Sequence, residues 1–224
     1  MVAPKFSTKP KICYRPIRPS DLETLEHIHT KVFPVRYEAT FFHDVVNGCD
    51  IVSWGVVDSN RPDGRCDELI GFVTARVVFA KESEIVDLLG YDSAKSDQTV
   101  VYILTLGVVD TYRKLGIASS LIKEVIKYAS SIPTCRAVYL HVISYNKPAI
   151  FLYKKMSFKC IRRLQEFYLI NGLHYDSYLF MYYLLPAIVG YLRSGFKLMA
   201  ARLCKCKSDD RKISKWTKCK DKIR

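Results

Sequence analysis

The sequence lacks three features that mark zinc-binding, secreted and membrane-spanning proteins. Its eight cysteines are scattered, with no CxxC pair and no histidine at zinc-site spacing, so reduced thiols are expected rather than a disulfide framework. The first 16 residues contain lysines but not the apolar segment of a signal peptide, so secretion is not expected. No run of 18 uncharged apolar residues occurs, which argues against a spanning helix.

Acidic residues are scarce at one end of the chain. Of the 224 residues, 49% are hydrophobic and 25% are charged, an ordinary globular composition with a net charge of +13. Residues 185–224 hold 12 Lys or Arg against 3 Asp or Glu, a charge of +9, which leaves +4 for the other residues. We therefore expect one domain over residues 12–184 and a basic tail over residues 185–224.

Hydrophobic periodicity and turn signals predict alternating strands and helices. In residues 117–129 one apolar stripe is predicted, formed by Ile117, Leu121, Ile122, Val125, Ile126 and Ala129. Ser20 and Glu23 have the spacing of a capping box, and Gly48 is typical of a helix end. Residues 81–99 are polar and lack periodicity, so we expect an insertion with a function or mobility. The expected helices are 21–31, 38–48, 117–129 and 146–158, and the expected strands are 12–17, 51–58, 68–80, 100–109, 136–145, 159–170 and 174–185. This order is typical of a mixed α/β sheet.

The turn GVVDTYRKLGIASSLI, which enters the helix 117–129, is basic and contains an internal glycine. A helix N-terminus offers unpaired N–H groups and the positive end of the helix dipole, so it can bind phosphate. Gly116 allows a pyrophosphate to approach the backbone, and Arg113 and Lys114 add positive charge. An Asp or Ser cap is missing, which fits because an acid would repel the ligand. By itself the RxxGxA pattern also fits an ordinary basic surface turn.

Three segments resemble a known family. YRKLGIASSLI resembles the acetyl-CoA motif of the Gcn5-related N-acetyltransferase (GNAT) superfamily. FPVRY, VYILTLGVVDTYRKLGIASSLI and VYLHVISYNKPAIFLYKKMSF are together similar to the N-terminal acetyltransferases, in particular the membrane-associated NatF type. The resemblance covers residues 13–184. It implies the GNAT fold, a mixed, mostly antiparallel twisted sheet flanked by helices, with acetyl-CoA as co-substrate and no metal.

The resemblance also implies which residues hold acetyl-CoA. It assigns Leu106, Gly107 and Val108 to the pantetheine arm, Arg113, Lys114, Leu115, Gly116, Ile117 and Ala118 to the pyrophosphate, and Asn146 and Tyr153 to the lining of the cofactor site. Independently, Gly107 within a β-branched strand indicates a bulge or a close approach of the ligand. Asn146 is equally typical of a helix N-cap, and Tyr153 of a core aromatic residue.

The catalytic pair implied by the resemblance is Tyr102 and His141, on neighbouring strands. An α-amine has an unperturbed pKa of about 8, so a base must take its proton at neutral pH. A lone histidine in an apolar strand is also commonly an interior residue with satisfied hydrogen bonds. Tyr102, with an unperturbed pKa of about 10, is a poor base unless its environment shifts it, so orienting water or donating a proton to the thiolate are the other roles expected.

For the protein substrate, the resemblance implies a pocket formed by the loop after the first helix, one strand residue and the last hairpin. The implied residues are Phe33, Pro34, Val35, Tyr37, Leu104 and Tyr168. An apolar pocket fits an initiator Met, so substrates beginning Met-Lys or Met-hydrophobic are expected. Arg36 stands where some relatives carry an acid, and Phe167 replaces a family tyrosine. The loop is also typical of a helix-breaking turn with buried aromatic residues.

The tail sequence predicts an amphipathic helix with cationic flanks. Ile188, Leu192, Phe196, Met199 and Leu203 share one face, opposite residues such as Arg193 and Lys197. We expect a peripheral helix on the cytosolic side of the plasma membrane or Golgi, strengthened by acylation of Cys204 or Cys206. The alternatives are a helix docked on the domain and a nucleic-acid contact, which suits the apolar face less well.

The expected function is acetyl transfer from acetyl-CoA to the α-amine of Met-starting N-termini at a membrane surface. Its expected partners are N-termini, including those of membrane proteins, and no obligate auxiliary subunit is evident. A lysine (histone-type) acetyltransferase is the enzymatic alternative. A non-catalytic membrane or nucleic-acid adaptor on a degenerate acyl-CoA fold is the alternative of another class, which Tyr102, His141 and the intact RxxGxA pattern disfavour.

Overall fold

The computed structural model of the chain describes residues 9–89 and 97–184. The helices are α1 (Leu22–Val32), α2 (Ala39–Asn47), α3 (Ile117–Ser130) and α4 (Lys147–Lys155), with short 3-10 turns η1 (Pro19–Asp21), η2 (Ala80–Glu82), η3 (Val86–Leu88) and η4 (Asp110–Tyr112). The strands are β1 (Ile12–Arg15), β2 (Val52–Asp58), β3 (Leu69–Phe79), β4 (Thr99–Val108), β5 (Cys135–Ile143), β6 (Lys159–Ile170) and β7 (Leu173–Tyr183). Within this part of the chain, no helix has the length and apolar character needed to cross a bilayer.

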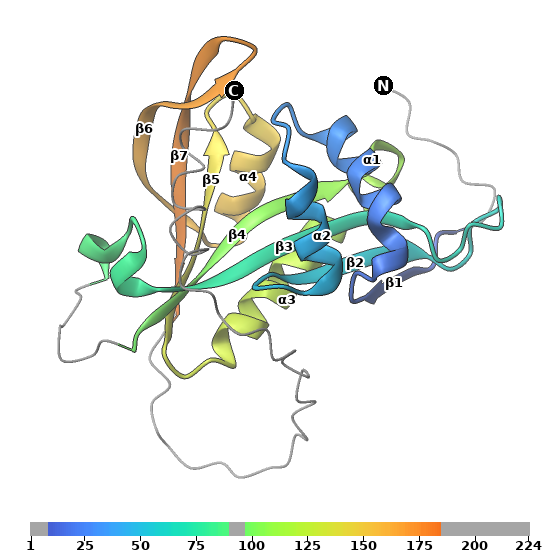
Figure 1. The fold of residues 1–224 in the computed structure, drawn as a ribbon, viewed down its shortest axis with the longest axis horizontal. Coiled ribbons are helices and arrows are strands. Elements are labelled where there is room, and N and C mark those ends of the chain that lie inside the picture. Colours follow the sequence, from blue (N-terminus) through green and yellow to red (C-terminus); the bar gives the residue numbers. More distant parts are fainter. Residues whose placement is uncertain (1–8, 90–96, 185–224) are drawn as a thin grey trace.

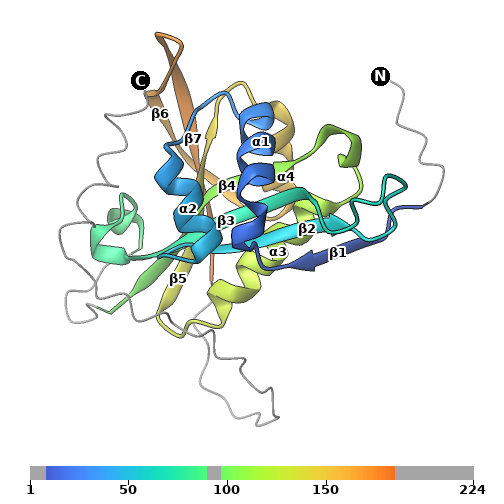
Figure 2. The ribbon, with the colours of Figure 1, turned by 45° about the vertical axis from the view of Figure 1, so that its right-hand side comes forward.

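All seven strands form one sheet, in the order β1-β2-β3-β4-β5-β7-β6. Neighbouring strands are antiparallel except β4 and β5, which are parallel and joined through α3. Figure 1 shows α1 and α2 in front of the sheet and α3 and α4 behind it. The loop between α1 and α2 and the β6–β7 hairpin project toward the same end of the molecule in Figures 1 and 2. The predicted mixed, mostly antiparallel sheet flanked by helices is confirmed.

Each face of the sheet buries its own hydrophobic cluster. The predicted stripe of α3 packs against β2, β3, β4 and β5 through Ile117, Leu121, Ile122, Val125 and Ala129, all of them buried. Ile126, the sixth member of the predicted stripe, is half-buried. On the other face, α1 and α2 pack Leu25, Phe41 and Val45 around Phe72 of β3. Burial of one such large side chain contributes about 1.5–3 kcal/mol, so the two clusters fix the helices on the sheet.

The first helix begins differently from the prediction. The turn η1 precedes α1, and Asp21 rather than Ser20 occupies the capping position. The backbone N–H of Arg18 donates to the Asp21 carboxylate (2.7 Å), and the Arg15 guanidinium donates to both carboxylate oxygens (2.7 and 2.8 Å). Asp21 is buried, and a buried carboxylate requires such charged and backbone donors. The capping box predicted from Ser20 and Glu23 is therefore wrong.

The polar segment that follows β3 folds back on the sheet. Its first part forms η2 and η3, and Ile85 between them is fully buried against Val100, Tyr139 and Met181. Residues 90–96 lie outside the described residues. The apolar anchor at Ile85 holds the neighbouring Glu84 next to β5, where the candidate site lies.

The core under α1 and α2 contains a buried titratable group, His29. Only 2% of this residue is exposed. Its ring stacks on Phe33 with centroids 4.4 Å apart, and meets Tyr37 (4.8 Å) and Phe42 (5.2 Å) edge-on. Nε2 has no hydrogen-bond partner among the described residues. Burial disfavours the charged ring and lowers the pKa of His29 from 6.5 to about 4.

We expect His29 to make the domain less stable as the pH falls. The native ring stays neutral down to about pH 4, whereas the ring in the unfolded chain takes up a proton below about pH 6.5. The contribution to stability is therefore complete above pH 6.5 and is lost as the pH falls toward 4. Between pH 7.5 and 5.0 the loss is about 2 kcal/mol, measurable by urea unfolding of the wild type and of His29→Phe.

The control is His27→Gln, which changes an exposed histidine of the same helix and should keep the wild-type dependence on pH. His29→Phe should lose about 2 kcal/mol less than the wild type over this interval. The same loss in both proteins would show that another group is responsible.

Candidate active site

The parallel strands β4 and β5 pair only over their first halves. The registered partners are Thr99 with Cys135, Val101 with Val138 and Tyr102 with Tyr139. Beyond this point β4 continues to Val108 and β5 to Ile143, with no further pairing between them. A bulge at Leu104 interrupts the register of β4 with β3 just past Tyr102. The second half of β4 therefore leaves backbone groups on its β5 side that an extended ligand can pair with.

Tyr102 and His141 lie together where the two strands separate. The Tyr102 hydroxyl is 3.1 Å from His141 Nδ1, and the side chain of His141 is 1% exposed. Glu84 Oε1 lies 3.3 Å from His141 Nε2, within the range of a charge interaction, although Nε2 has no aligned hydrogen-bond partner among the described residues. Phe167 of β6 stacks on the imidazole with centroids 4.4 Å apart. The ring is thus held on three sides.

The direction of the hydrogen bond follows from the neighbouring charges. Burial, followed by the nearby Tyr168 and Tyr37, raises the pKa of Tyr102 well above its usual value, so its hydroxyl keeps the proton. A carboxylate beside Nε2 favours the tautomer with the proton on that nitrogen. Nδ1 of His141 then accepts from the Tyr102 O–H. Glu84, His141 and Tyr102 form a chain in which a carboxylate, an imidazole and a hydroxyl follow one another.

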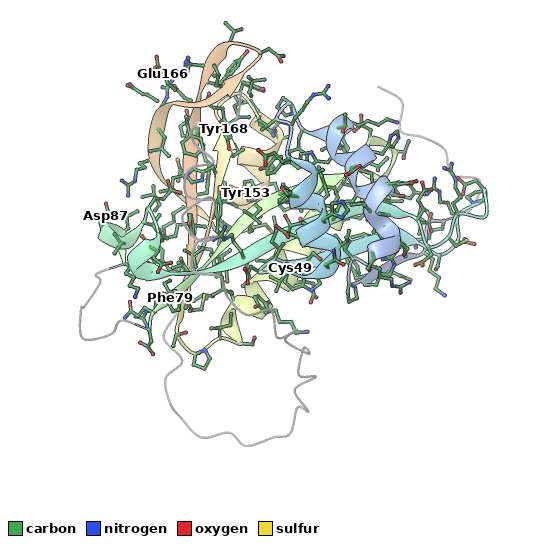
Figure 3. The ribbon with its side chains drawn as sticks, in the orientation of Figure 1. Cys49, Phe79, Asp87, Tyr153, Glu166 and Tyr168 are labelled. Carbon is green, nitrogen blue, oxygen red and sulfur yellow. The ribbon has the colours of Figure 1, made fainter. Side chains whose placement is uncertain are left out.

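Two elements far apart in sequence meet over Tyr102. Tyr37 comes from the loop between α1 and α2, and Tyr168 comes from β6, where the register with β7 shifts between Leu164 and Tyr168. Burial also raises the pKa of Tyr168, and Tyr37 is the second cause. Figure 3 shows Tyr168 between the β6–β7 hairpin and α2, and Glu166 at the outer edge of β6. The hairpin and the loop thus approach the site from two sides.

The loop after α1 supplies an apolar wall. Phe33, Tyr37 and Leu104 are half-buried and pack on the hydrophobic cluster of α1 and α2. Of the other predicted loop residues, Val35 is half-buried and Pro34 is exposed. The structure therefore places Tyr37 and Tyr168 near Tyr102, whereas Phe33 packs beside Phe72 and Gly107 on the α1–α2 face and Pro34 is exposed.

The start of α3 has the character of an anion site. Gly116 occupies the capping position with φ 81°, a conformation that favours glycine, and no side chain caps the helix. Its first turn carries no acid, so its N–H groups keep their capacity for an anion. Lys114 and Leu115 are exposed beside it. Arg113 is engaged elsewhere, because its guanidinium donates to Val108 O (3.2 Å) and pairs with Asp110 (2.6 Å).

Two predicted cofactor residues also have structural roles. The Asn146 side chain accepts a hydrogen bond from Ala149 N (3.2 Å), which makes it the N-cap of α4. Tyr153 is buried, and its ring lies 5.7 Å from that of Phe158 and 6.0 Å from that of Phe180. Figure 3 shows Tyr153 near the centre of the molecule. Both alternatives considered from the sequence therefore describe real contacts, and a role of either residue toward a cofactor stays a prediction.

Gly107 is explained by packing and not by a bulge. It pairs regularly with Phe72, whereas the bulge of β4 is at Leu104. A Cβ atom at Gly107 would lie 3.1 Å from the Phe72 ring and 3.3 Å from the Phe33 ring. Two rings of the protein therefore account for the glycine on the α1–α2 face, and the close approach of a ligand to Gly107 stays a prediction.

Glu84 is the site residue that the sequence did not single out. It lies in the polar segment for which a function was expected, but no periodicity connects it to His141, 57 positions further along the sequence. Its position depends on the burial of Ile85. Among residues 9–89 and 97–184, no group of three or more His, Cys, Asp or Glu is arranged to hold a metal ion.

Comparison with known proteins identifies relatives along most of the chain. The acetyltransferase (GNAT) family model matches residues 22–158. "Histone acetyltransferase MCC1" of Arabidopsis thaliana is 54% identical over 228 aligned positions, 96% of this chain and 91% of that protein. "N-alpha-acetyltransferase 60" of Xenopus tropicalis is 30% identical over 166, covering 73% of this chain and 66% of that protein.

Two crystal structures of Arabidopsis thaliana NAA60 also match. One contains a bisubstrate analogue, is 66% identical and has a TM-score of 0.75, covering 79% of this chain and all of that chain. The other contains acetyl-CoA, is 68% identical and has the same TM-score, covering 77% of this chain and 98% of that chain.

Gly107→Ala is expected to destabilise the domain. The added methyl group must displace the Phe72 and Phe33 rings, and overpacking of this kind costs about 1–3 kcal/mol. Urea unfolding of Gly107→Ala, Phe72→Leu and the double variant measures the coupling. The alanine should cost less in the Phe72→Leu background, because the smaller side chain leaves space. An equal cost in both backgrounds would show that ring packing is not the reason for glycine.

Proposed function

The chain belongs to the acetyltransferase (GNAT) family, and on that premise we propose that it transfers the acetyl group of acetyl-CoA to the α-amine of protein N-termini. Relatives named N-alpha-acetyltransferase 60, and the Arabidopsis thaliana structures with acetyl-CoA and with a bisubstrate analogue, support this assignment. The observation that carries this proposal is the row of interacting side chains from Glu84 through His141 to Tyr102, which lies where β4 and β5 separate. It provides a base next to the expected thioester.

The proposed proton path uses a neutral tyrosine and a neutral histidine. The incoming α-amine gives a proton to the Tyr102 oxygen as the Tyr102 O–H proton passes to His141 Nδ1. The tyrosine stays neutral, which suits its raised pKa. The imidazolium formed is stabilised by the Glu84 carboxylate at 3.3 Å. When the thiolate leaves, the same path returns a proton to it.

The residues fit acetyl-CoA at two places. The uncapped N-terminus of α3 and the exposed Lys114 suit the pyrophosphate, and the unpaired second half of β4 suits the pantetheine amides. Arg113 would have to release Asp110 to reach a phosphate. Acetyl-CoA supplies the activated acetyl group, and the protein supplies position, proton transfer and exclusion of water.

The substrate opening suits a chain end. Phe33, Tyr37 and Leu104 offer an apolar wall for the side chain of an initiator Met. Tyr37 from the α1–α2 loop and Tyr168 from β6 both lie near Tyr102, and we expect two elements over the site to admit a chain end more easily than an internal lysine on a loop. Because one relative is named a histone acetyltransferase, transfer to lysine is the second candidate.

We further propose that the protein acts on Met-starting N-termini at the cytosolic face of a membrane, the plasma membrane or the Golgi. Residues 185–224 support this location through their amphipathic pattern and their charge of +9. The tail lies outside the described residues, so its expected helix and the acylation of Cys204 or Cys206 stay predictions. The division into a domain over 12–184 and a tail over 185–224 is proposed on the same pattern.

The test of substrate class compares two peptides. One has a free Met-Lys N-terminus, and the other has a blocked N-terminus and an internal lysine. With full-length protein and acetyl-CoA, tandem mass spectrometry should locate the acetyl group on the α-amine of the first peptide only. Acetylation of the internal lysine would favour the lysine enzyme, and no transfer to either peptide would favour a non-catalytic adaptor.

Variants of the proton path should lower turnover without loss of acetyl-CoA binding. Tyr102→Phe and His141→Ala are each expected to reduce kcat at least about tenfold, since general base catalysis contributes roughly 100-fold or more. Glu84→Gln should reduce kcat about tenfold by removing the charge beside Nε2. Glu82→Gln, an exposed acid in the same segment, is the matched control. Initial rates measure turnover, and calorimetric titration measures acetyl-CoA binding. A variant with an unchanged kcat would show that the substituted residue is not part of the proton path.

A further inference from the structure

Charge is divided between the two faces of the sheet. The helices α3 and α4 contain five lysines and one acid, a net charge of +4. Residues 19–50, which supply η1, α1 and α2 on the opposite face, contain two Lys or Arg and six Asp or Glu, a net charge of −4. The domain therefore has a positive α3–α4 face and a negative α1–α2 face.

The positive charge is concentrated around the end of β7. An open hollow of about 430 Å³ between α3, α4 and β7 has Lys123, Lys127 and Lys155 at its walls, together with Ile126, Met156 and Tyr182. Lys159, at the start of β6, lies over the Tyr183 ring with its Nζ 6.0 Å from the centroid. These four lysines are exposed, and within the described part of the chain none forms an ion pair.

Other basic residues of this region are already neutralised. Arg162 pairs with Asp87 at 3.1 Å, and Arg163 pairs with Asp176. The lysines around the hollow, in contrast, have no ion-pair partner among the described residues. Lysine stems can lie on apolar surface while their ammonium groups reach anionic headgroups, and the hollow offers this combination.

The basic tail begins at the same place. Leu184 N donates to Arg136 O at 2.9 Å, which fixes the end of the described domain beside the start of β5. Residues 185–224, with their charge of +9, follow directly. Because the lysines and the tail have the same sign, the tail's cations are poor partners for this surface. An anionic surface that attracts the basic tail would also attract these lysines.

Resting on the membrane location proposed above, we infer that the α3–α4 face is a second membrane-binding surface, which docks on anionic phospholipid through Lys123, Lys127, Lys155 and Lys159. This contact turns the negative α1–α2 face toward the aqueous phase. The loop between α1 and α2, which forms one side of the substrate opening, then stays accessible to N-termini. The tail provides attachment and the lysine face provides orientation.

The test measures vesicle partition of the full-length protein. Lys127→Glu/Lys155→Glu/Lys159→Glu changes the three lysines at the ends of α3 and α4 and the start of β6, away from the helix N-termini expected to bind acetyl-CoA. On vesicles of phosphatidylcholine with phosphatidylserine, its partition coefficient should fall about tenfold or more below wild type. Lys9→Glu/Lys11→Glu/Lys81→Glu changes the net charge equally at exposed lysines elsewhere and should stay within about threefold of wild type.

Acetyl transfer to a short peptide without vesicles, with an unchanged KM for acetyl-CoA, shows that the first triple variant is folded. Hydrogen exchange on wild-type protein should show protection by anionic vesicles in residues 117–130 and 147–159 and none in residues 22–47.

Equal partition of the wild type and the first triple variant would overturn the inference and leave membrane association in place. Failure of the wild type to bind anionic vesicles would overturn both the membrane location proposed above and this second membrane-binding surface. Lysine-dependent binding of duplex DNA with unchanged vesicle partition would assign the face to nucleic acid instead.

Discussion

The separation of β4 from β5 after Tyr102 is the constraint on which the candidate site depends. These strands form the one parallel pair among the described strands, and their pairing stops at Tyr102 and Tyr139. The bulge at Leu104 lies just beyond that point. The crossover through α3 places the N-terminus of α3 at the open end, and the chain leaving β5 places that of α4 there too. Unpaired backbone, helix N-termini and one polar residue from each strand therefore meet in one place.

Two buried histidines of this protein show how environment determines chemical role. His29 has aromatic rings around it and no partner for Nε2 among the described residues, so its ring is held neutral and contributes packing. His141 is equally buried at its side chain, but it faces the Tyr102 hydroxyl and the Glu84 carboxylate. A proton on His141 has a charge nearby to stabilise it, which a proton on His29 lacks. Only His141 is therefore suited to proton transfer.

Local patterns predicted the elements well, and long-range contacts explain what they missed. The stripe of α3, the end of α2 at Gly48 and the mixed sheet follow from periodicity and turn chemistry. Ser20 is not the cap because the chain enters α1 through the turn η1, in which Asp21 accepts from Arg18 N–H and pairs with Arg15 of the preceding strand. The order of β6 and β7 and the contact of Glu84 with His141 depend on pairing and burial across many residues. No local period encodes such contacts.

In the proposed membrane contact, salt screens the charges that lie far from the bilayer. The orientation of the protein therefore depends on the charges of the face that touches the lipid. The Debye length at physiological ionic strength is about 8 Å, whereas a helix alone is about 10 Å across. Charges on α1 and α2, beyond the sheet, are therefore largely screened from a bilayer that contacts α3 and α4. In the opposite orientation, the α1–α2 face, with its net charge of −4, would lie within the Debye length of the anionic surface and would be repelled. Attraction on one face and repulsion on the other thus select the same orientation, in which the α1–α2 side of the substrate opening faces water.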